Sequence, residues 1–588
     1  MSSDSTTLAT RDQATDVVNF KISLKGSAIN GEYALTSLHL IKAFNKISFV
    51  KITITDGDPA KQDFTISSTD DKLTPGSEIE IALGYHSKAQ TVFKGIIIRH
   101  ALKSNKNKQS SLTIEAKDKA VKLSLGRNSH CYIDKTDKDI IEAIARRSGF
   151  GAPDLDVAAT SVQHKQMVQY NAVDWDFIVT RAEMNGMLVL TDNNKLVIKA
   201  PDTTQQPAKE LTYGVDVIEF ESEIDASSQV KAVKTHAWNY TDQKIEDSPA
   251  ASISFKESGN LKSDDLALAF GDGESNLYHT GSLNKDELTA WGNAKLLKSK
   301  LAKAMGKIKL KGTTEIKPGQ VIKLNGFGKR FNGNVLVTGI RQSYDHSIWE
   351  TEVQFGLPEQ WFYQREDVVA KPAAGLLPGI HGLQIGTVIQ LENDPDNQDR
   401  IKIQLPLIDP GESIWARVAS LDAGKERGAF FRPEVQDEVI VGFLNDDPRY
   451  PVVLGMLNSG AKPAPVQAKD TNHEKGFVTR SKMKLFFNDD KKSISIETPQ
   501  GKKIVLDEDG DTILLTDDHG NKVTMNAEGI SIESAKDISL KAASGNIKMQ
   551  ALNIESKANV KFSAEANASA SLQSSGQTVV KGGIVNIN

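Results

Sequence analysis

The last hundred residues of the chain repeat one short pattern that few folds can accommodate. Pairs of aliphatic residues separated by a single residue recur from Ile494/Ile496 to Val585/Ile587. Gly, Ala, Ser, Asn and charged residues fill the intervals, and Phe562 is the only aromatic residue after Asn488. Alternation of this kind predicts a series of short β-strands, each with one buried face.

Such strands do not balance their folding cost within one chain. Burying two aliphatic side chains per strand stabilises by about 3–6 kcal/mol, whereas ordering roughly eight residues costs about 8–16 kcal/mol. Pairing with identical strands from other chains satisfies every strand edge. The pattern therefore predicts an intertwined trimeric β-prism, a stiff needle over residues 491–588. One alternative is a single-chain β-helix, which would use longer coils and larger stacked side chains. The other is a low-complexity disordered tail, and the regular doublets disfavour it.

We predict a needle core made of these doublet residues: Val523, Met525, Ile530, Ile532, Ile538, Leu540, Ile547, Met549, Ile554, Val560 and Phe562.

Residues 19–368 mix strands with three predicted helices and follow a flexible N-terminus, residues 1–18. Thr136 and Asp139 fit a capping box, and Gly149 fits the C-terminal stop of that first helix. The second helix is expected between Asn171, as its N-cap, and Gly186. The third helix is predicted from apolar residues at helical spacing: Leu288, Trp291, Leu297, Leu301 and Met305.

Two stretches in this region resemble each other. Leu73–Leu83 and Ile316–Gly326 each contain a Pro-Gly turn, and each is followed by a Phe-x-Gly element, at Phe93 and at Phe331. The repeat predicts a hub of two related β-barrels; chance similarity of two turns is the alternative. Overall the fold class is mainly β and multidomain.

A Pro/Gly-rich linker, residues 369–382, separates the hub from a compact β segment. Five short strand patterns over residues 383–460 suit an OB-fold barrel. Residues 461–490 are then expected to form a connector to the needle.

Composition excludes several classes of function. A chain of 588 residues should hold several domains. Its net charge of −5, without a long basic block, argues against nucleic acid as a partner.

The N-terminal sequence has no signal peptide pattern, so we expect synthesis in the cytoplasm. Cys131 is the single cysteine and is expected to be a small buried hydrophobe.

Several stretches resemble one known family. The segments "RIKIQLP", "SIWARV" and "GAFFRPEVQDEVIVGFLNDDPRYPVVLG" lie in the OB-like region, and "QYNAVDWDF" lies in the hub. Further matches are "GKKIVLDEDGDTILLTDDHGNKVTMNAEGISIESAKDISLKA" and the terminal "GGIVNIN". The chain resembles VgrG, the trimeric spike of contractile injection systems, which corresponds to the fused hub and spike of phage tails.

The resemblance implies a mechanical function. It implies a homotrimer that joins a hexameric inner tube and baseplate components to a threefold needle and punctures the target envelope, with transient contact to the target membrane. The spike would belong to the injection apparatus and leave the cell on firing, and effectors would be carried as cargo. A PAAR-type tip protein is expected at the needle end: Ile584, Val585, Asn586, Ile587 and Asn588. A type VI system, an extracellular injection particle and a tailocin all remain open.

We predict no enzyme activity, no catalytic residue, no cofactor and no metal site. Some phage relatives carry a lysozyme between OB domain and needle, and the segment Asn458–Lys484 is too short for one. An effector domain after the needle is not expected either. Asp345, His346 and Ser347 are interpreted as a satisfied surface or edge-strand cluster, and Asp507–Thr512 as a solvated turn. An envelope hydrolase and a trimeric adhesin are the alternative functions.

Overall fold

The computed structural model describes residues 17–28, 34–69, 73–85, 88–106, 108–249, 251–271 and 273–587. Most of the predicted flexible N-terminus, and Asn588, lie outside these residues. The chain forms two compact units, one reaching Ile380 and including Asn445–Pro448, the other comprising His381–Leu444 and Arg449 onward. Each unit is described by itself below.

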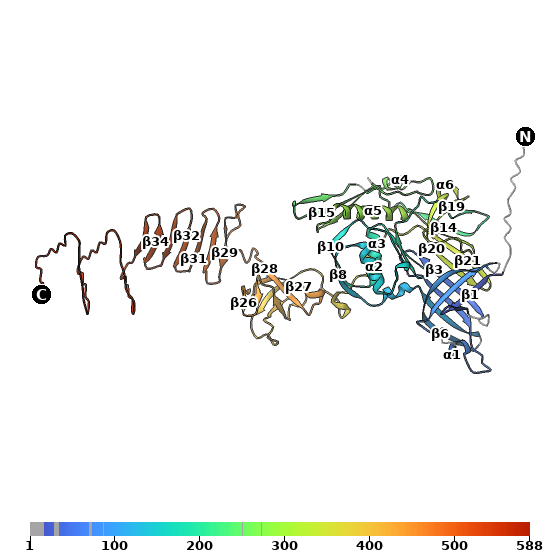
Figure 1. Ribbon diagram of the computed structural model, residues 1–588, viewed down its shortest axis with the longest axis horizontal. Coiled ribbons are helices and arrows are strands. Elements are labelled where there is room, and N and C mark those ends of the chain that lie inside the picture. The colour runs from blue at the N-terminus through green and yellow to red at the C-terminus, as the bar shows by residue number, and fades with distance from the viewer. Residues whose placement is uncertain are drawn as a thin grey trace, which may run out of the picture. The chain divides into compact units, whose positions relative to one another are not determined.

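A thirteen-stranded sheet dominates the first unit (Figure 1). Its N-terminal half consists of β1 (Asn19–Leu24), β2 (Ser27–Ala28), β3 (Leu35–Ala43), β4 (Phe49–Thr55), β5 (Glu78–Gly84), β6 (Gln90–Asn105) and β7 (Lys108–Lys117). Its second half consists of β13 (Lys209–Thr212), β14 (Val217–Ile224), β18 (Ala304–Lys311), β19 (Val321–Asn325), β20 (Gly333–Asp345) and β21 (Ile348–Phe355). Short helices α1 (Thr65–Thr69) and α6 (Gly328–Phe331) lie in the connections.

The two halves share one topology. The spatial order β1-β5-β6-β7-β4-β3 is repeated as β13-β19-β20-β21-β18-β14, and the order along the chain corresponds as well. Each half encloses its own apolar cluster, and pairing of β3 with β20 joins the halves. The predicted duplication of the hub is therefore present in its strand order. One difference is that β1 pairs antiparallel with β5, whereas β13 pairs parallel with β19.

The Pro-Gly turns are equivalent in detail. The backbone N–H of Gly76 donates to the carbonyl of Ile97 at 2.8 Å, and that of Gly319 donates to Val337 at 2.8 Å. Both glycines have positive φ, 94° and 90°, and a β-bulge follows both Ile97 and Val337. The Phe-x-Gly elements are not equivalent: they precede these partners by different spacings, so Phe93 lies within β6, whereas the phenylalanine of the second element ends α6.

A mixed insertion connects the halves. It contains η2 (Lys119–Ser124), β8 (Asn128–Thr136), α2 (Asp137–Arg147), η3 (Ala152–Asp154), β9 (Leu155–Val157), β10 (Gln163–Ala172), α3 (Asp174–Met184), β11 (Leu188–Asp192) and β12 (Lys195–Lys199). β10 pairs with β8, and β9, β11 and β12 form a small sheet. Helices α2 and α3 bury their apolar faces in a common core.

The caps of these helices are partly as predicted. Thr136 and Asp139 form the capping box of α2, and Gly149 follows its C-cap with φ of 88°. The predicted N-cap Asn171 is wrong, because β10 continues to Ala172 across a bulge and α3 starts only at Asp174. The prediction of a buried Cys131 is also wrong: this residue is exposed on β8.

The third helix, α5 (Lys285–Ala302), packs against β15 (Ala232–Asn239), which pairs with β16 (Lys244–Asp247) and β17 (Glu274–His279). It ends at Ala302, so the predicted extension to Met305 is wrong, because Met305 pairs with Glu223 as part of β18. Helix α4 (Ser263–Leu268) precedes β17, and η4 (Phe362–Gln364) and η5 (Pro372–Gly375) follow β21.

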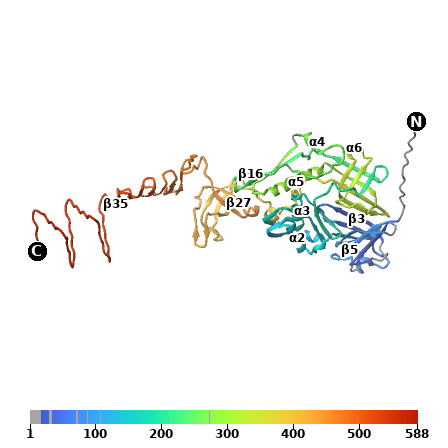
Figure 2. The ribbon, with the colours of Figure 1, turned by 45° about the horizontal axis from the view of Figure 1, so that its top comes forward.

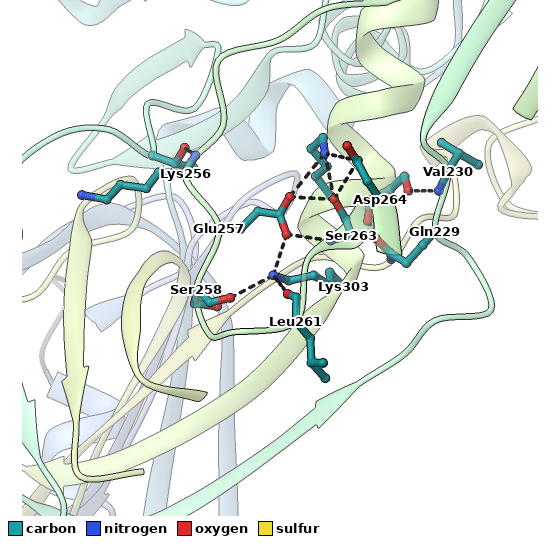
Figure 3. Close-up of polar contacts among 12 residues, drawn as sticks. Gln229, Val230, Lys256, Glu257, Ser258, Leu261, Ser263, Asp264 and Lys303 are labelled. Atoms are coloured by element: carbon teal, nitrogen blue, oxygen red, sulfur yellow. Dashed lines mark hydrogen bonds and ion pairs between the residues drawn. The ribbon is translucent and has the colours of Figure 1, made fainter. Parts of the chain in front are cut away.

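A buried ion cluster fixes the C-terminal end of α5 (Figure 3). The Nζ of Lys303 lies 2.7 Å from Glu257 Oε2 and also donates to the carbonyls of Ser258 and Leu261. Ser263 Oγ donates to Glu257 Oε1 at 2.6 Å. Burial opposes ionisation of Glu257, but the hydrogen bonds from Lys303 and Ser263 outweigh it and lower the pKa to about 2. The carboxylate therefore ties the loop before α4 to the end of α5.

The second unit begins with a closed five-stranded barrel, in the order β22-β23-β24-β28-β27. Its strands and short elements are β22 (Gln384–Gln390), β23 (Ile401–Gln404), β24 (Ile414–Val418), β25 (Ala423–Gly424), β26 (Arg427–Gly428), β27 (Glu438–Phe443), η6 (Leu444–Asp446, shared with the first unit) and β28 (Pro451–Met456). Aliphatic residues from all five strands fill the interior. The barrel lies inside the range predicted for an OB-fold.

A separate seven-stranded antiparallel meander follows the barrel (Figure 1). Its strands are β29 (Glu474–Val478), β30 (Lys484–Asn488), β31 (Ser493–Glu497), β32 (Lys503–Asp507), β33 (Thr512–Thr516), β34 (Lys522–Asn526) and β35 (Gly529–Glu533). The sheet starts within residues 461–490, so this segment is not only a connector. Up to residue 587, the described chain contains no strand after β35, and Figure 2 draws that segment without arrows.

Candidate functional site

The meander places the sequence doublets opposite one another on neighbouring strands. Ile504 of β32 faces Ile496 on one side and Leu515 on the other. Because residues two apart in a strand share a face, the doublets build two parallel apolar rows on one face. The first row is Phe477, Leu485, Ile496, Ile504, Leu515, Val523 and Ile532. The second row is Phe487, Ile494, Leu506, Ile513, Met525 and Ile530.

Polar turns hold this register. Gly520, with φ of 85°, occupies the turn between β33 and β34, a conformation that favours glycine. Across the strand ends, Lys492 pairs with Asp509 at 3.0 Å and Lys502 with Asp518 at 2.9 Å. The hydrogen bond from Lys502 lowers the pKa of Asp518. Charged ends and apolar doublets therefore alternate along the chain and specify where each strand stops.

The two rows have no cover from the described part of the chain. Ile504 and Leu515 are each 40% exposed, and Ile532 is 58% exposed. Val505 and Leu514, which point to the other face, are half-buried. Contiguous exposed aliphatic surface of this kind marks an interaction site. The face carrying both rows, here called the row face, is the candidate functional site.

The predicted needle core divides into two groups. Val523, Met525, Ile530 and Ile532 lie together in the rows. The remaining predicted residues lie after β35, in no strand and exposed: Ile538, Leu540, Ile547, Met549, Ile554, Val560 and Phe562. The predicted tip residues are likewise exposed and outside any strand, except Asn588, which lies outside the described residues: Ile584, Val585, Asn586 and Ile587.

Sequence reasoning missed the first strands of the row face. Phe477, Leu485 and Phe487 extend the rows into β29 and β30. Leu485 and Phe487 have the same spacing as every other doublet, and that spacing could have found them.

The motifs considered for chemistry lie in turns. His346 and Ser347 have φ of 45° and 70° and form the hairpin turn between β20 and β21, where His346 Nδ1 lies 2.9 Å from Asp345 Oδ1. In the Asp507–Thr512 segment, Gly510 N–H donates to Asp507 Oδ1 at 3.0 Å. Among the described residues, no group of three or more His, Cys, Asp or Glu is placed to hold a metal ion. In the same part of the chain, no helix combines the length and apolar character of a membrane span.

His164 is the most strongly shifted histidine of the first unit. Its Nε2 lies 3.0 Å from Asp137 Oδ2 and its Nδ1 lies 3.2 Å from Glu287 Oε1. Arg181 Nε donates to the other oxygen of Asp137 at 2.6 Å. Hydrogen bonds to Asp137 and Glu287 raise the pKa of His164 to about 9. Because both ring nitrogens donate to carboxylates, this imidazolium serves to join β10, α2 and α5.

Three protein family models match this chain and identify its family. A family model described as the Alg8 N-terminal domain matches residues 14–346, more than half of the chain. A model of the type VI secretion system/phage-baseplate injector OB domain matches residues 384–457, and one of the phage baseplate V C-terminal trimerisation domain matches residues 478–555. The chain belongs to the Alg8 N-terminal domain family and is a VgrG-family spike protein.

Curated relatives of this VgrG-family chain are themselves named as spike proteins. Type VI secretion system spike protein VgrG3 of Vibrio cholerae is 30% identical over 145 residues, covering 23% of this chain and 14% of the relative. VgrG1b of Pseudomonas aeruginosa is 21% identical over 444 residues, covering 69% of this chain and 57% of the relative. The matched regions therefore span less than two thirds of the length of these relatives.

Solved structures resemble the chain at low similarity. A type VI secretion system component of E. coli is 16% identical, with a TM-score of 0.39, covering 74% of this chain and 100% of that one. A prophage MuSo2 tail protein of Shewanella oneidensis is 12% identical, with a TM-score of 0.44, covering 58% and 99%. The matched trimerisation model spans the row face of this VgrG-family spike from residue 478 onward.

Proposed function

We propose that the chain is the homotrimeric central spike of a contractile injection machine. The observation that carries this proposal is the row face, two continuous rows of exposed apolar residues on one sheet. Burying each Ile or Leu of these rows would stabilise by about 1.5–3 kcal/mol. Three sheets that turn their row faces toward one axis give a closed prism in which each face is covered by the other two copies.

The same proposal accounts for the segment after β35. Its apolar doublets continue with the spacing of the sheet, yet they form no strand within the described chain. Backbone N–H and C=O groups require partners, and strands from two other copies would supply them. The needle would then extend from β29 to the chain end, and residues 584–588 would form a blunt threefold surface that receives a PAAR-type tip protein.

The hub has the internal repeat that a sixfold partner requires. Each chain contributes two halves with the same strand order, so three chains present six similar β units. Such a ring matches a hexameric inner tube, and baseplate components would bind around it. On contraction the tube advances and the spike breaches the target envelope first, carrying the tip protein and any effectors. The spike is thus a component of the injection apparatus and leaves the cell on firing.

The action proposed here is mechanical and non-catalytic. We propose that the described domains act through rigidity and assembly, without a cofactor or metal. Electron microscopy of injection particles purified with this chain tests the proposal: it predicts a threefold needle joined to the tube end. Finding the chain only on the cell surface would favour the adhesin, and clearing of a peptidoglycan gel by the purified trimer would favour the hydrolase.

A further inference from the structure

The row face does not end at the first strand of the meander. Phe477 of β29 is the first residue of the first row and is 45% exposed. Its ring stacks on that of Phe431, with centroids 4.9 Å apart and planes 12° apart. Phe431 comes from the loop between β26 and β27 of the OB barrel. The apolar row therefore continues from the sheet onto the barrel.

Two further contacts fix this loop in place. Arg480, in the turn between β29 and β30, pairs with Glu434 at 3.1 Å. On the barrel side, Arg432 forms an ion pair with Asp399. The two ion pairs therefore hold the loop to the hairpin through Arg480 and to the barrel through Asp399.

The loop between β26 and β27 exposes aromatic surface that the ring stack leaves uncovered. Phe431 remains 59% exposed despite its contact with Phe477, and its neighbour Phe430 is 82% exposed. These two adjacent phenylalanines are continuous with the uncovered row face. They therefore form an exposed apolar patch and are not isolated surface residues. Buried aromatic residues near a polar, charged rim are typical anchors of protein interfaces.

We propose that Phe430 and Phe431 extend the interface between copies of this chain onto the OB barrel, with Phe430 packing against a second copy. This inference rests on the proposed trimer. The second copy is the occupant because the patch continues the row face, which the other copies cover. The matched trimerisation model starts at residue 478, beyond this loop, and the loop belongs to the range matched by the OB model. The loop is thus an anchor placed at the start of the needle.

The test compares two aspartate variants of the full-length chain. Phe430→Asp should raise the trimer dissociation constant at least about tenfold, measured by light scattering over a dilution series. The matched control is Leu407→Asp, a barrel residue that is 91% exposed and outside the rows, and it should leave the constant unchanged. Equal effects of the two variants would overturn the inference. A wild-type chain that stays monomeric would instead overturn the proposed function on which the inference rests.

Cross-linking provides a second readout that does not depend on stability. Cys131 is the only cysteine, so a Phe430→Cys variant in a Cys131→Ser background carries one reactive thiol. In mixed trimers with a second variant that carries Phe477→Cys and Cys131→Ser, a short bis-maleimide should join the two thiols of different chains, which gives a covalent dimer band. Absence of that band from an intact mixed trimer would overturn the inference.

Discussion

Ile504 and Leu515 lie directly opposite each other on β32 and β33, and each remains 40% exposed within its own chain. A cross-strand aliphatic pair contributes to sheet stability through burial, and these two residues are only partly buried. The same relationship recurs along both rows of the row face. The sheet therefore leaves along both rows an apolar surface without cover from the described part of its own chain.

A charge placed in the row face should prevent assembly. Leu515→Asp would bury a carboxylate without a partner, which costs several kcal/mol, so the variant should be largely monomeric by light scattering at micromolar concentration. Thr516→Asp is the matched control, because Thr516 points to the other face and lies opposite Lys503. A trimeric Leu515→Asp variant would contradict the assignment of the row face as the interface.

The hub should lose stability as pH rises toward 9. His164 has a pKa raised from 6.5 to about 9 by Asp137 and Glu287. Its contribution is complete below pH 6.5 and is lost as pH rises through 9, because the folded state then gives up a proton that its hydrogen bonds held. Calorimetry should show a falling midpoint of the hub transition over this range. His164→Gln should flatten that slope; an unchanged slope would show that other groups cause it.

Removing the carboxylate of the buried ion cluster should destabilise the hub strongly. Glu257→Gln leaves the Lys303 ammonium, whose side chain is 3% exposed, without its counter-charge, which costs about 3–5 kcal/mol. Glu221→Gln breaks the exposed pair with Lys307 and should cost less than about 1 kcal/mol. Chemical denaturation of the two variants measures the difference.

The same ion cluster predicts that the hub loses stability at low pH. The pKa of Glu257 is lowered from 4.5 to about 2, so its contribution is present above pH 4.5 and is lost as pH falls through 2. The wild-type hub should therefore weaken over this range more steeply than the Glu257→Gln variant. Parallel pH profiles for the two proteins would contradict this role of Glu257.

The equivalence of the two hub halves can be tested at their turns. Gly76→Ala and Gly319→Ala each force an alanine into positive φ, which costs about 1–2 kcal/mol. Because neither site is crowded, the two costs should be similar. Gly271→Ala, at a glycine without positive φ and with open space around it, is the control and should change the unfolding midpoint little. A large difference between the first two variants would argue against equivalent turns.

Local sequence patterns predicted the features that depend on local chemistry. The capping box at Thr136, the stop at Gly149 and the strand doublets from Ile494 to Ile532 follow from hydrogen bonding and alternation within a few residues. The boundaries at Asn171 and Met305 were wrong because pairing with distant strands overrides helical spacing there. The partner strands, β8 for β10 and β14 for β18, cannot be inferred from the local sequence pattern.

The sequence predicted that the candidate site is an apolar strand face, but it did not predict where this face begins. The alternation alone predicted strands with one apolar face that is buried in a trimer, and Val523, Met525, Ile530 and Ile532 were assigned to that face. The start of the face at Phe477 and its contact with Phe431 were not predictable, because a stack between a barrel loop and a hairpin depends on tertiary structure. The residues after β35 remain a prediction that only the assembled protein can test.

The native mass of the full-length chain tests the central claim most directly. Light scattering should give a mass near three times 64.1 kDa that persists on dilution to micromolar concentration, because each row face is covered only by other copies. A mass of 64.1 kDa under those conditions would mean that the row face stays uncovered in solution, and it would contradict the trimeric spike.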